Sequence, residues 1–368
     1  MKSVVMLSGV LAALFAACTL NDNMARLNHI QMIGSHNSYK KPLDLKIKAL
    51  MVEQNADAVA RIDYSHPPLS VQLNMGMRHF EIDIVKDPDG GQFANPLGEI
   101  LTRQQILTGQ QRDEHKVPGF KVMHIPDLDF QSHCILFTAC LNELLNFSNS
   151  NPRHLPIVIL MNFKGTGSRF INGTPVLPFN RSDYKEVDNV LFKTFGDKLI
   201  TPDEVRGDYE TLEEGALNGG WPLLSAARGR FLFILDGKAE ERQIYRDNNP
   251  SLSGRALFSS YLPGEPEAAL MIRNNAIEQF DEIKELVKQG YIVRTRADSG
   301  QGSNSNEEAV RTRTNSAINS GAQIISTDFY PNAPQKVSSE FSVSFATKEL
   351  NRCSPFNSDT RCTIEIDN

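Results

Sequence analysis

Two carboxylates separated by one residue offer the most distinctive chemistry in the chain. Glu81 and Asp83 lie in a run typical of a β-strand, and strand residues at i and i+2 face the same side. Two adjacent anions repel each other unless a cation lies between them, and Ca2+ with its oxygen ligands meets that need. The amide oxygens of Asn37 and Asn162 would complete a shell suited to Ca2+ or Mg2+. Zinc is disfavoured, because no thiolate and too few clustered histidines accompany them.

The same spacing admits a second, purely structural interpretation. Glu81 and Asp83 could pair with Arg78 or Lys121 and form a salt-bridge layer within the fold. Spacing alone does not separate this layer from a metal site, so both interpretations stay open.

Two histidines suit general acid and base catalysis. His36 and His124 are the candidates, because a free imidazole titrates near neutral pH and a positioned proton transfer contributes about 10²–10⁴-fold to a rate. Phosphodiester cleavage needs a base for the attacking hydroxyl, an acid for the leaving oxygen and positive charge near the phosphoryl oxygens. The two histidines, the metal and Lys164 would supply these. His79 could face outward from its strand, and the other histidines are expected to be structural: His29, His66, His115, His133 and His154.

Composition and missing motifs exclude several other classes of function. The chain of 368 residues has a formal net charge of −6 and a pI near 5.8, without the basic face of a nucleic-acid binder. It has no lysine- or arginine-rich run suited to anionic membranes. No G-x-S-x-G elbow and no Walker-type loop occurs.

The elements that must position these residues follow the pattern of repeated βα units. Helical patterns at 141–147, 184–195 and 276–289 alternate with strand-like runs, and polar loops are expected at 165–178, 207–220 and 299–306. The pattern predicts an α/β fold, a (β/α)8 TIM-like barrel forming one domain over residues 19–368. Eight runs are expected to be its strands: 29–33, 79–85, 120–125, 157–163, 230–235, 256–261, 291–296 and 323–327.

Polar side chains occur at the ends of seven of these expected strands. Because catalytic groups of such barrels lie at the carboxyl ends of strands, we expect these side chains to meet at one mouth. They are His36 and Asn37, Glu81 and Asp83, His124, Asn162 and Lys164, Asp236 and Lys238, Arg294 with Arg296 and Asp298, and Asp328.

The first 18 residues predict an export signal. Lys2 precedes an apolar stretch, 4–17, that is too short to span a bilayer comfortably, so we expect an exported protein that is secreted, periplasmic or lipid-anchored through Cys18. Ordinary cleavage nearby is the alternative to lipidation.

The close pairs Cys134/Cys140 and Cys353/Cys362 favour disulfides over a metal cluster, and the second pair would close a C-terminal tail.

The Gly-Ser-His-Asn-Ser-Tyr run at 34–39 resembles the end of the first strand in the phospholipase C catalytic barrel. The sequence is most similar to the bacterial and fungal calcium-dependent phosphatidylinositol phospholipases C. The resemblance covers roughly residues 26–335 and implies the barrel of this family. It continues through His66-Pro67-Pro68-Leu69, Gln72-Leu73, Gly76-Met77-Arg78, Glu81-Ile82-Asp83, His124-Ile125-Pro126 with Asp129, Pro156-Ile157-Val158, Arg294-Thr295-Arg296-Ala297-Asp298 and Ser320-Gly321-Ala322-Gln323 with Ser326-Thr327-Asp328.

This resemblance implies a reaction and a set of roles. The inositol 2-hydroxyl would attack phosphorus and release diacylglycerol and an inositol cyclic phosphate, with a phospholipid at a membrane surface as substrate. The resemblance implies the catalytic pair His36 and His124, the Ca2+ ligands Asn37, Glu81, Asp83 and an acid on the fourth strand, and the head-group residues Lys164, Lys238 and Arg296.

One position departs from the family pattern. The fourth-strand acid is replaced by Asn162, which offers a carbonyl ligand without charge, so Ca2+ would bind less tightly.

Two other functions stay open: a phosphodiesterase of the same fold acting on another glycerophospholipid or a sphingolipid, and a weakly active or inactive lipid-binding envelope protein. The sequence gives no indication of the oligomeric state.

Overall fold

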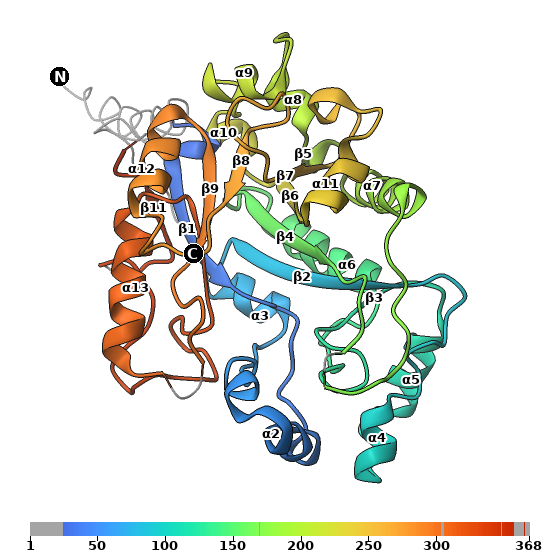
Figure 1. Ribbon diagram of the computed structural model, residues 1–368. Helices are drawn as coiled ribbons and strands as arrows, with labels where there is room; N and C mark the ends of the chain where they lie inside the picture. The colour runs from blue at the N-terminus through green and yellow to red at the C-terminus, as the bar shows by residue number, and fades with distance from the viewer. Residues whose placement is uncertain (1–24, 169, 303–304, 347, 357–363, 365–368) are drawn as a thin grey trace, which may run out of the picture.

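Eight parallel strands, taken in chain order, surround the centre of the fold. The computed structural model describes residues 25–168, 170–302, 305–346, 348–356 and 364 (Figure 1). One sheet holds β2–β4–β6–β7 and the other holds β8–β9–β10–β1, each pairing being parallel. The strands are β1 (Ile30–Ser35), β2 (His79–Asp87), β4 (Ile157–Phe163), β6 (Phe231–Asp236), β7 (Leu257–Ser259), β8 (Leu270–Ile272), β9 (Ile292–Arg296) and β10 (Ile324–Thr327).

Two seams join these sheets. At the first, the Ser38 amide donates to the Glu81 carbonyl oxygen over 2.8 Å. There β1 passes β2 so closely that a Cβ at Gly34 would lie 1.9 Å from the carbonyl oxygen of His79, and therefore only glycine fits. At the second seam, Ser260 and Leu270 form an isolated parallel bridge. Few main-chain hydrogen bonds join the strands at either seam. Even so, the eight strands are arranged in chain order around a single core.

One expected barrel strand is wrong. Residues 120–125 contribute to β3 (Gly119–Val122), which pairs antiparallel with the carboxyl half of β2 and lies outside the ring. The missing member of the ring is β8. The βα pattern does not reveal it, because the segment between Ser259 and Leu270 contains no helix and β8 has only 3 residues.

Helices cover the outside of the barrel (Figure 1). In α7, buried Tyr184, Val187, Leu191 and Phe195 follow the helical repeat, and Asn180 caps the first turn by accepting two backbone N–H groups. The helices are α2 (Leu45–Ala60), α3 (Leu69–Asn74), α4 (Leu97–Thr102), α5 (Gly109–Lys116), α6 (Phe137–Ser150), α7 (Arg181–Phe195), α8 (Pro202–Arg206), α9 (Leu212–Leu217), α10 (Leu224–Ala227), α11 (Ala239–Arg246), α12 (Phe280–Gln289) and α13 (Glu307–Asn319), with short 3-10 turns η1 (Leu27–His29), η2 (Gly196–Lys198) and η3 (Pro250–Leu252). Thus α6 and α7 contain the helical patterns predicted at 141–147 and 184–195, and α12 covers the later part of the one predicted at 276–289, whereas α9 lies in an expected loop.

A second, smaller core lies beside the barrel. Ile47 and Met51 of α2 pack with Phe93 and Leu107 from the segment that follows β2. A Cβ at Gly98 would lie 2.6 Å from Ile47 Cδ1, so the glycine lets α4 approach α2 closely. We call the three segments that extend from β1, β2 and β4 around this core the rim unit: residues 41–63, 88–118, and 165–168 with 170–178.

The C-terminal tail adds a strand to the barrel. The tail strand β11 (Asn351–Cys353) pairs antiparallel with β1, and the two-residue β5 (Leu199–Ile200) extends the other sheet. The predicted Cys134–Cys140 disulfide is confirmed. The export signal at 1–18 lies outside the described residues, and so does Cys362, the expected partner of Cys353. Within the described residues no helix combines the length and the apolar character needed to cross a bilayer.

Candidate active site

His36 follows β1 directly and lies among charged groups from three other strands. Its Nδ1 is 3.4 Å from Asp328 Oδ1, and its Nε2 is 3.1 Å from Arg296 Nη1 and 3.7 Å from Glu81 Oε1. Burial, and then the positive charge of Arg296, lower the pKa of His36 well below its usual value, although Asp328 opposes them. The imidazole is therefore neutral near pH 7 and able to accept a proton.

Asn37 presents an unused oxygen to the same space. Its φ of 48° lies in the left-handed region, which asparagine tolerates better than most residues. Its Nδ2 donates to the Tyr64 hydroxyl over 2.6 Å, which orients the amide. The buried Oδ1 accepts no hydrogen bond from the described residues. A buried acceptor without a partner is a candidate ligand atom.

Glu81 and Asp83 both lie buried on β2, and each has a basic partner. Glu81 Oε2 is 2.7 Å from Arg294 Nη2, and its Oε1 accepts from Asn162 Nδ2 over 2.9 Å. Asp83 Oδ2 is 3.0 Å from Lys164 Nζ. Lys164 is the ionic partner of this carboxylate, and the Tyr39 hydroxyl also lies beside it.

The alternative interpretation, a salt-bridge layer with Arg78 or Lys121, is wrong in its partners. Lys121 lies 3.1 Å from Asp87 at the far end of β2, and the Arg78 guanidinium donates to the carbonyl oxygens of Leu73 and Met77. The bases that reach the two acids come from the ends of β4 and β9 instead. Both acids therefore face the interior of the barrel mouth.

Burial raises the pKa of Glu81 to about 7. Arg294 opposes this rise, whereas the neighbouring carboxylate of Asp83 adds to it. The raised pKa therefore reflects chiefly the lost hydration of a buried carboxyl group.

His124 is held by a buried ion pair. Its Nδ1 is 2.7 Å from Asp129 Oδ2, and the same oxygen is 3.1 Å from Lys40 Nζ. Burial would raise the pKa of Asp129, but Lys40 and then His124 lower it below its ordinary value. Lys40, fully buried, also donates to the Tyr64 carbonyl oxygen over 2.8 Å. The imidazole of His124 thus has a fixed orientation.

The residues that sequence reasoning missed lie behind His36. Asp328 Oδ2 is 3.2 Å from Arg296 Nη2, and Asp328 Oδ1 is 3.4 Å from His66 Nε2. His66, expected to be structural, bonds through Nδ1 to the Tyr330 hydroxyl over 2.9 Å. Asp129, Arg294 and Asp328 appeared in motifs or at strand ends, but no sequence pattern indicated which side chains they contact.

The three expected head-group residues are placed differently. Lys164 and Arg296 lie within the cluster, where Arg296 also donates to Asp298 Oδ1 over 2.8 Å. Lys238, at the N-cap of α11, is exposed and forms no ion pair with another described residue. It therefore lies outside the buried cluster.

The donors present fit an oxygen-coordinated cation. Asn37 Oδ1 is a buried acceptor without a hydrogen bond from the described residues, and Glu81, Asp83 and Asn162 offer further oxygen atoms at the same mouth. The described ranges hold no set of three or more His, Cys, Asp or Glu side chains suited to a metal. The donors named above are two carboxylates and two amides. Such a shell suits Ca2+ rather than zinc.

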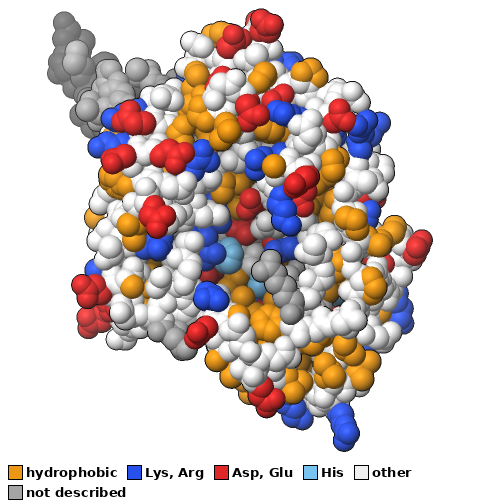
Figure 2. Space-filling view, viewed as in Figure 1, with side chains coloured by type: hydrophobic (Ala, Val, Ile, Leu, Met, Phe, Trp, Pro, Cys, Tyr) orange, Lys and Arg blue, Asp and Glu red, His pale blue; other side chains and the backbone are white. Residues whose placement is uncertain are grey.

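Figure 2 shows a hollow at the centre of this face, with histidine side chains at its floor and acidic and basic side chains around it.

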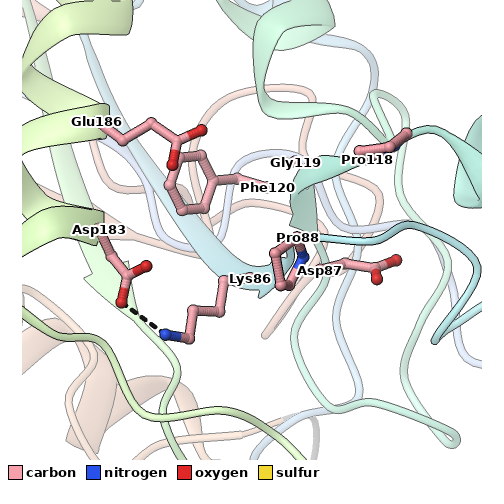
Figure 3. Close-up of a pocket in the computed structure, with 8 residues that line it drawn as sticks. All are labelled: Lys86, Asp87, Pro88, Pro118, Gly119, Phe120, Asp183 and Glu186. Atoms are coloured by element: carbon pink, nitrogen blue, oxygen red, sulfur yellow. Dashed lines mark hydrogen bonds and ion pairs between the residues drawn. The ribbon is translucent and has the colours of Figure 1, made fainter.

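A separate cavity of about 200 Å³ lies between β2, β3 and α7, where Lys86 Nζ pairs with Asp183 Oδ2 at 2.6 Å (Figure 3). None of the expected site residues lines it. Ionisable groups gathered at the strand ends of a barrel mark this mouth as the candidate catalytic site.

Comparison with known families specifies the class of protein. Residues 25–355 match the model of a family described as phosphoinositide phospholipase C, Ca2+-dependent. The match spans most of the chain, so the chain belongs to this family of enzymes, whose cofactor is Ca2+. No curated protein sequence matches the chain.

Solved structures confirm the predicted fold class. A calcium-dependent phosphoinositol-specific phospholipase C from Pseudomonas sp. has a TM-score of 0.54 and 16% identity, over 91% of this chain and 97% of that one. A Ca2+-dependent phosphatidylinositol-specific phospholipase C from Streptomyces antibioticus has a TM-score of 0.52 and 16% identity, over 85% of this chain and 100% of that one. At such identity the likeness concerns the fold, the TIM-like barrel of the phospholipase C type.

Proposed function

We propose that the chain cleaves phosphatidylinositol-type lipids to diacylglycerol and an inositol cyclic phosphate, with His36 as base and His124 as acid. One observation carries this proposal: each of the two proposed catalytic imidazoles lies beside a buried carboxylate, Asp328 for His36 and Asp129 for His124. Family membership supports the reaction class and the need for Ca2+.

In the first step His36 would remove the proton of the inositol 2-hydroxyl. Arg296 Nη1 donates to Nε2, so this nitrogen holds the lone pair and Nδ1 holds the proton. The hydroxyl takes the place of Arg296 at Nε2, and its oxygen forms a new bond to phosphorus. Asp328, 3.4 Å from Nδ1, would stabilise the resulting imidazolium.

In the same displacement His124 would protonate the leaving oxygen. The bond between phosphorus and the glycerol oxygen breaks, and His124 Nε2 gives its proton to that oxygen, which leaves as diacylglycerol. Asp129 holds Nδ1, so the ring cannot turn away from the substrate. His36 has then gained one proton and His124 has lost one. Before the next turnover, His36 would release its proton to solvent and His124 would take one up.

Positive charge for the phosphoryl oxygens would come from Lys164, Arg294 and Arg296. Ca2+, which Asn37, Glu81 and Asp83 with Asn162 would hold, would supply further positive charge at the same place. We propose that the exposed Lys238 contacts the head group from outside the cluster. Arg294 and Lys164 would have to share their carboxylates with the ion.

Purified protein is expected to release water-soluble cyclic inositol phosphate from phosphatidylinositol vesicles when Ca2+ is present. This release should stop when EGTA removes the Ca2+. A panel with phosphatidylcholine, glycerophosphodiesters and sphingomyelin tests the other substrate classes. Release that resists EGTA would remove the metal from the proposal. Hydrolysis of no lipid in the panel would favour the lipid-binding alternative.

Asn162→Glu is expected to tighten Ca2+ binding by roughly tenfold or more, because it adds a negative charge beside Glu81. Without Ca2+ the variant should unfold at a lower temperature, since two carboxylates then face each other. Isothermal calorimetry and thermal unfolding, each with and without Ca2+, measure both effects. Asn189→Glu on the exposed face of α7 is the control. An unchanged affinity would place Asn162 outside the metal shell.

A further inference from the structure

A single carboxylate oxygen lies between two histidines at the carboxyl end of β10. Asp328 Oδ1 is 3.4 Å from His36 Nδ1 and 3.4 Å from His66 Nε2. None of these three atoms forms a hydrogen bond with any other described residue. The side chain of His66 is fully buried, and a buried polar atom needs a partner. Among the described residues, this carboxylate is therefore the acceptor within reach of His66 Nε2.

The other ring nitrogen of His66 determines where its proton lies. His66 Nδ1 is 2.9 Å from the hydroxyl of Tyr330, two residues beyond Asp328. Burial, and then the negative charge of Asp328, raise the pKa of Tyr330, so the hydroxyl keeps its proton and can donate a hydrogen bond. Since Nδ1 accepts this bond, Nε2 carries the ring proton and directs it at the carboxylate. The contact with Tyr330 thus selects the tautomer in which His66 is a donor to Asp328.

Main-chain contacts tie His66 to the loop that follows β10. The His66 amide donates to the Lys40 carbonyl oxygen over 2.9 Å. The Ser65 amide donates to Gln335 Oε1 over 3.1 Å, and the side-chain amide of Gln335 donates in turn to the Asp328 carbonyl oxygen. Because the two segments are joined in this way, the imidazole and the carboxylate keep a fixed separation.

Arg296 by itself could not hold the carboxylate throughout the reaction. It lies 3.2 Å from Asp328 Oδ2, but it also donates to His36 Nε2 over 3.1 Å. In the proposed first step the substrate hydroxyl takes the place of Arg296 at Nε2, so the guanidinium must shift. His66 is buried behind the carboxylate, and its contact with Asp328 does not depend on the substrate.

We propose that His66 is a positioning residue for the base: its Nε2 holds the Asp328 carboxylate against His36 Nδ1 while His36 accepts a proton. Tyr330 supports this role by fixing the tautomer of His66. His66 itself transfers no proton to or from the substrate. The inference rests on the proposed function, because His36 needs an oriented carboxylate only if it acts as the base.

Two substitutions at His66 separate its N–H group from the volume that the ring fills. His66→Leu removes the donor and should lower kcat on monomeric short-chain phosphatidylinositol by roughly tenfold to a hundredfold, with KM nearly unchanged. His66→Gln keeps an N–H group at a similar reach, so its kcat should stay within roughly threefold of wild type. His154→Leu, which alters a buried imidazole preceding β4 at the opposite end of the barrel, should lower stability but not kcat. Equal losses of kcat in the two His66 variants would overturn the proposal.

A double-mutant cycle tests whether His66 acts through Asp328. Asp328→Ala alone should slow cleavage. Adding His66→Leu to it should change kcat by less than roughly twofold, because no carboxylate remains to be held. If His66 serves the fold alone, His66→Leu should slow both backgrounds by the same factor, and that result would contradict a positioning role.

Tyr330→Phe keeps the proposal testable if the His66 variants fold poorly. It removes one hydroxyl and keeps the ring that stacks on His66. The kcat should fall roughly three- to tenfold with KM unchanged, because the imidazole is then free to take the other tautomer. A kcat equal to that of wild type would overturn the proposal.

Crystal structures of the variants separate failure of this inference from failure of the proposed function. The Asp328 carboxylate should stay beside His36 Nδ1 in His66→Gln and should turn away from it in His66→Leu. A carboxylate that keeps its place in His66→Leu would overturn the inference, whatever the rate. A carboxylate that turns as expected, in a protein whose wild type cleaves no phosphatidylinositol, would support the positioning role and overturn the proposed function alone.

Discussion

His36→Ala and His124→Ala are each expected to slow phosphatidylinositol cleavage by about 10²–10⁴-fold. Each variant removes one proton-transfer group, while the charged residues that hold the substrate remain. The measurement is the initial rate on phosphatidylinositol vesicles with saturating Ca2+, together with vesicle binding, which should be unchanged. The double variant His36→Ala/His124→Ala should show a smaller reduction in rate than the product of the two single reductions, because both histidines act in one displacement.

A histidine at the opposite end of the same strand provides the matched control. His29 precedes β1, whereas His36 follows it. The Nδ1 of His29 accepts a hydrogen bond from the Arg26 amide over 3.3 Å. His29→Ala should therefore keep nearly the full rate. Near-wild-type activity in His36→Ala or His124→Ala would show that the histidine concerned transfers no proton in the reaction.

Asp129→Ala is expected to lower both stability and rate. The change leaves the fully buried Lys40 without its carboxylate partner, which costs about 3–5 kcal/mol of unfolding free energy. It also frees His124, so up to the full catalytic factor of that histidine, about 10²–10⁴-fold, is lost. Because the pKa of Asp129 is lowered, its stabilisation is present above about pH 4 and is lost at lower pH. Denaturant unfolding at pH 7 is the appropriate measurement.

A second variant separates the two roles of Asp129. Lys40→Met with Asp129→Leu removes both charges of the pair, so most of the lost stability should return. The rate should stay low, because His124 still lacks its hydrogen-bond acceptor. A rate that recovers together with stability would show that Asp129 acts through folding alone and does not position the imidazole.

Much of the candidate site is predictable from local patterns. The two-residue repeat of strands places Glu81 and Asp83 on one face, and both point into the mouth. The run at 34–39 and the later motifs indicate the family that the match over residues 25–355 confirms. Roles assigned to single residues within the mouth remain predictions.

Other features depend on packing that no local pattern encodes. Residues 120–125 have strand composition, but that composition is the same for a barrel strand and for an antiparallel ribbon such as β3. The short β8 has too few residues for a recognisable pattern, and its main-chain pairing depends on β9 and on a single bridge to Ser260. Neighbouring strands, rather than composition, decide these two assignments.

By itself the sequence determined the fold class, the strand that bears the paired acids and the chemistry of the residues at strand ends. Only the tertiary structure decided how these charges pair: Arg294 lies beside Glu81, 213 residues away in the chain, and Asp328 lies beside His36. The physical reason is that side-chain direction follows from backbone repeats over a few residues. The choice of ionic partner, by contrast, depends on distances of a few ångströms that exist only after β10 has paired with β1.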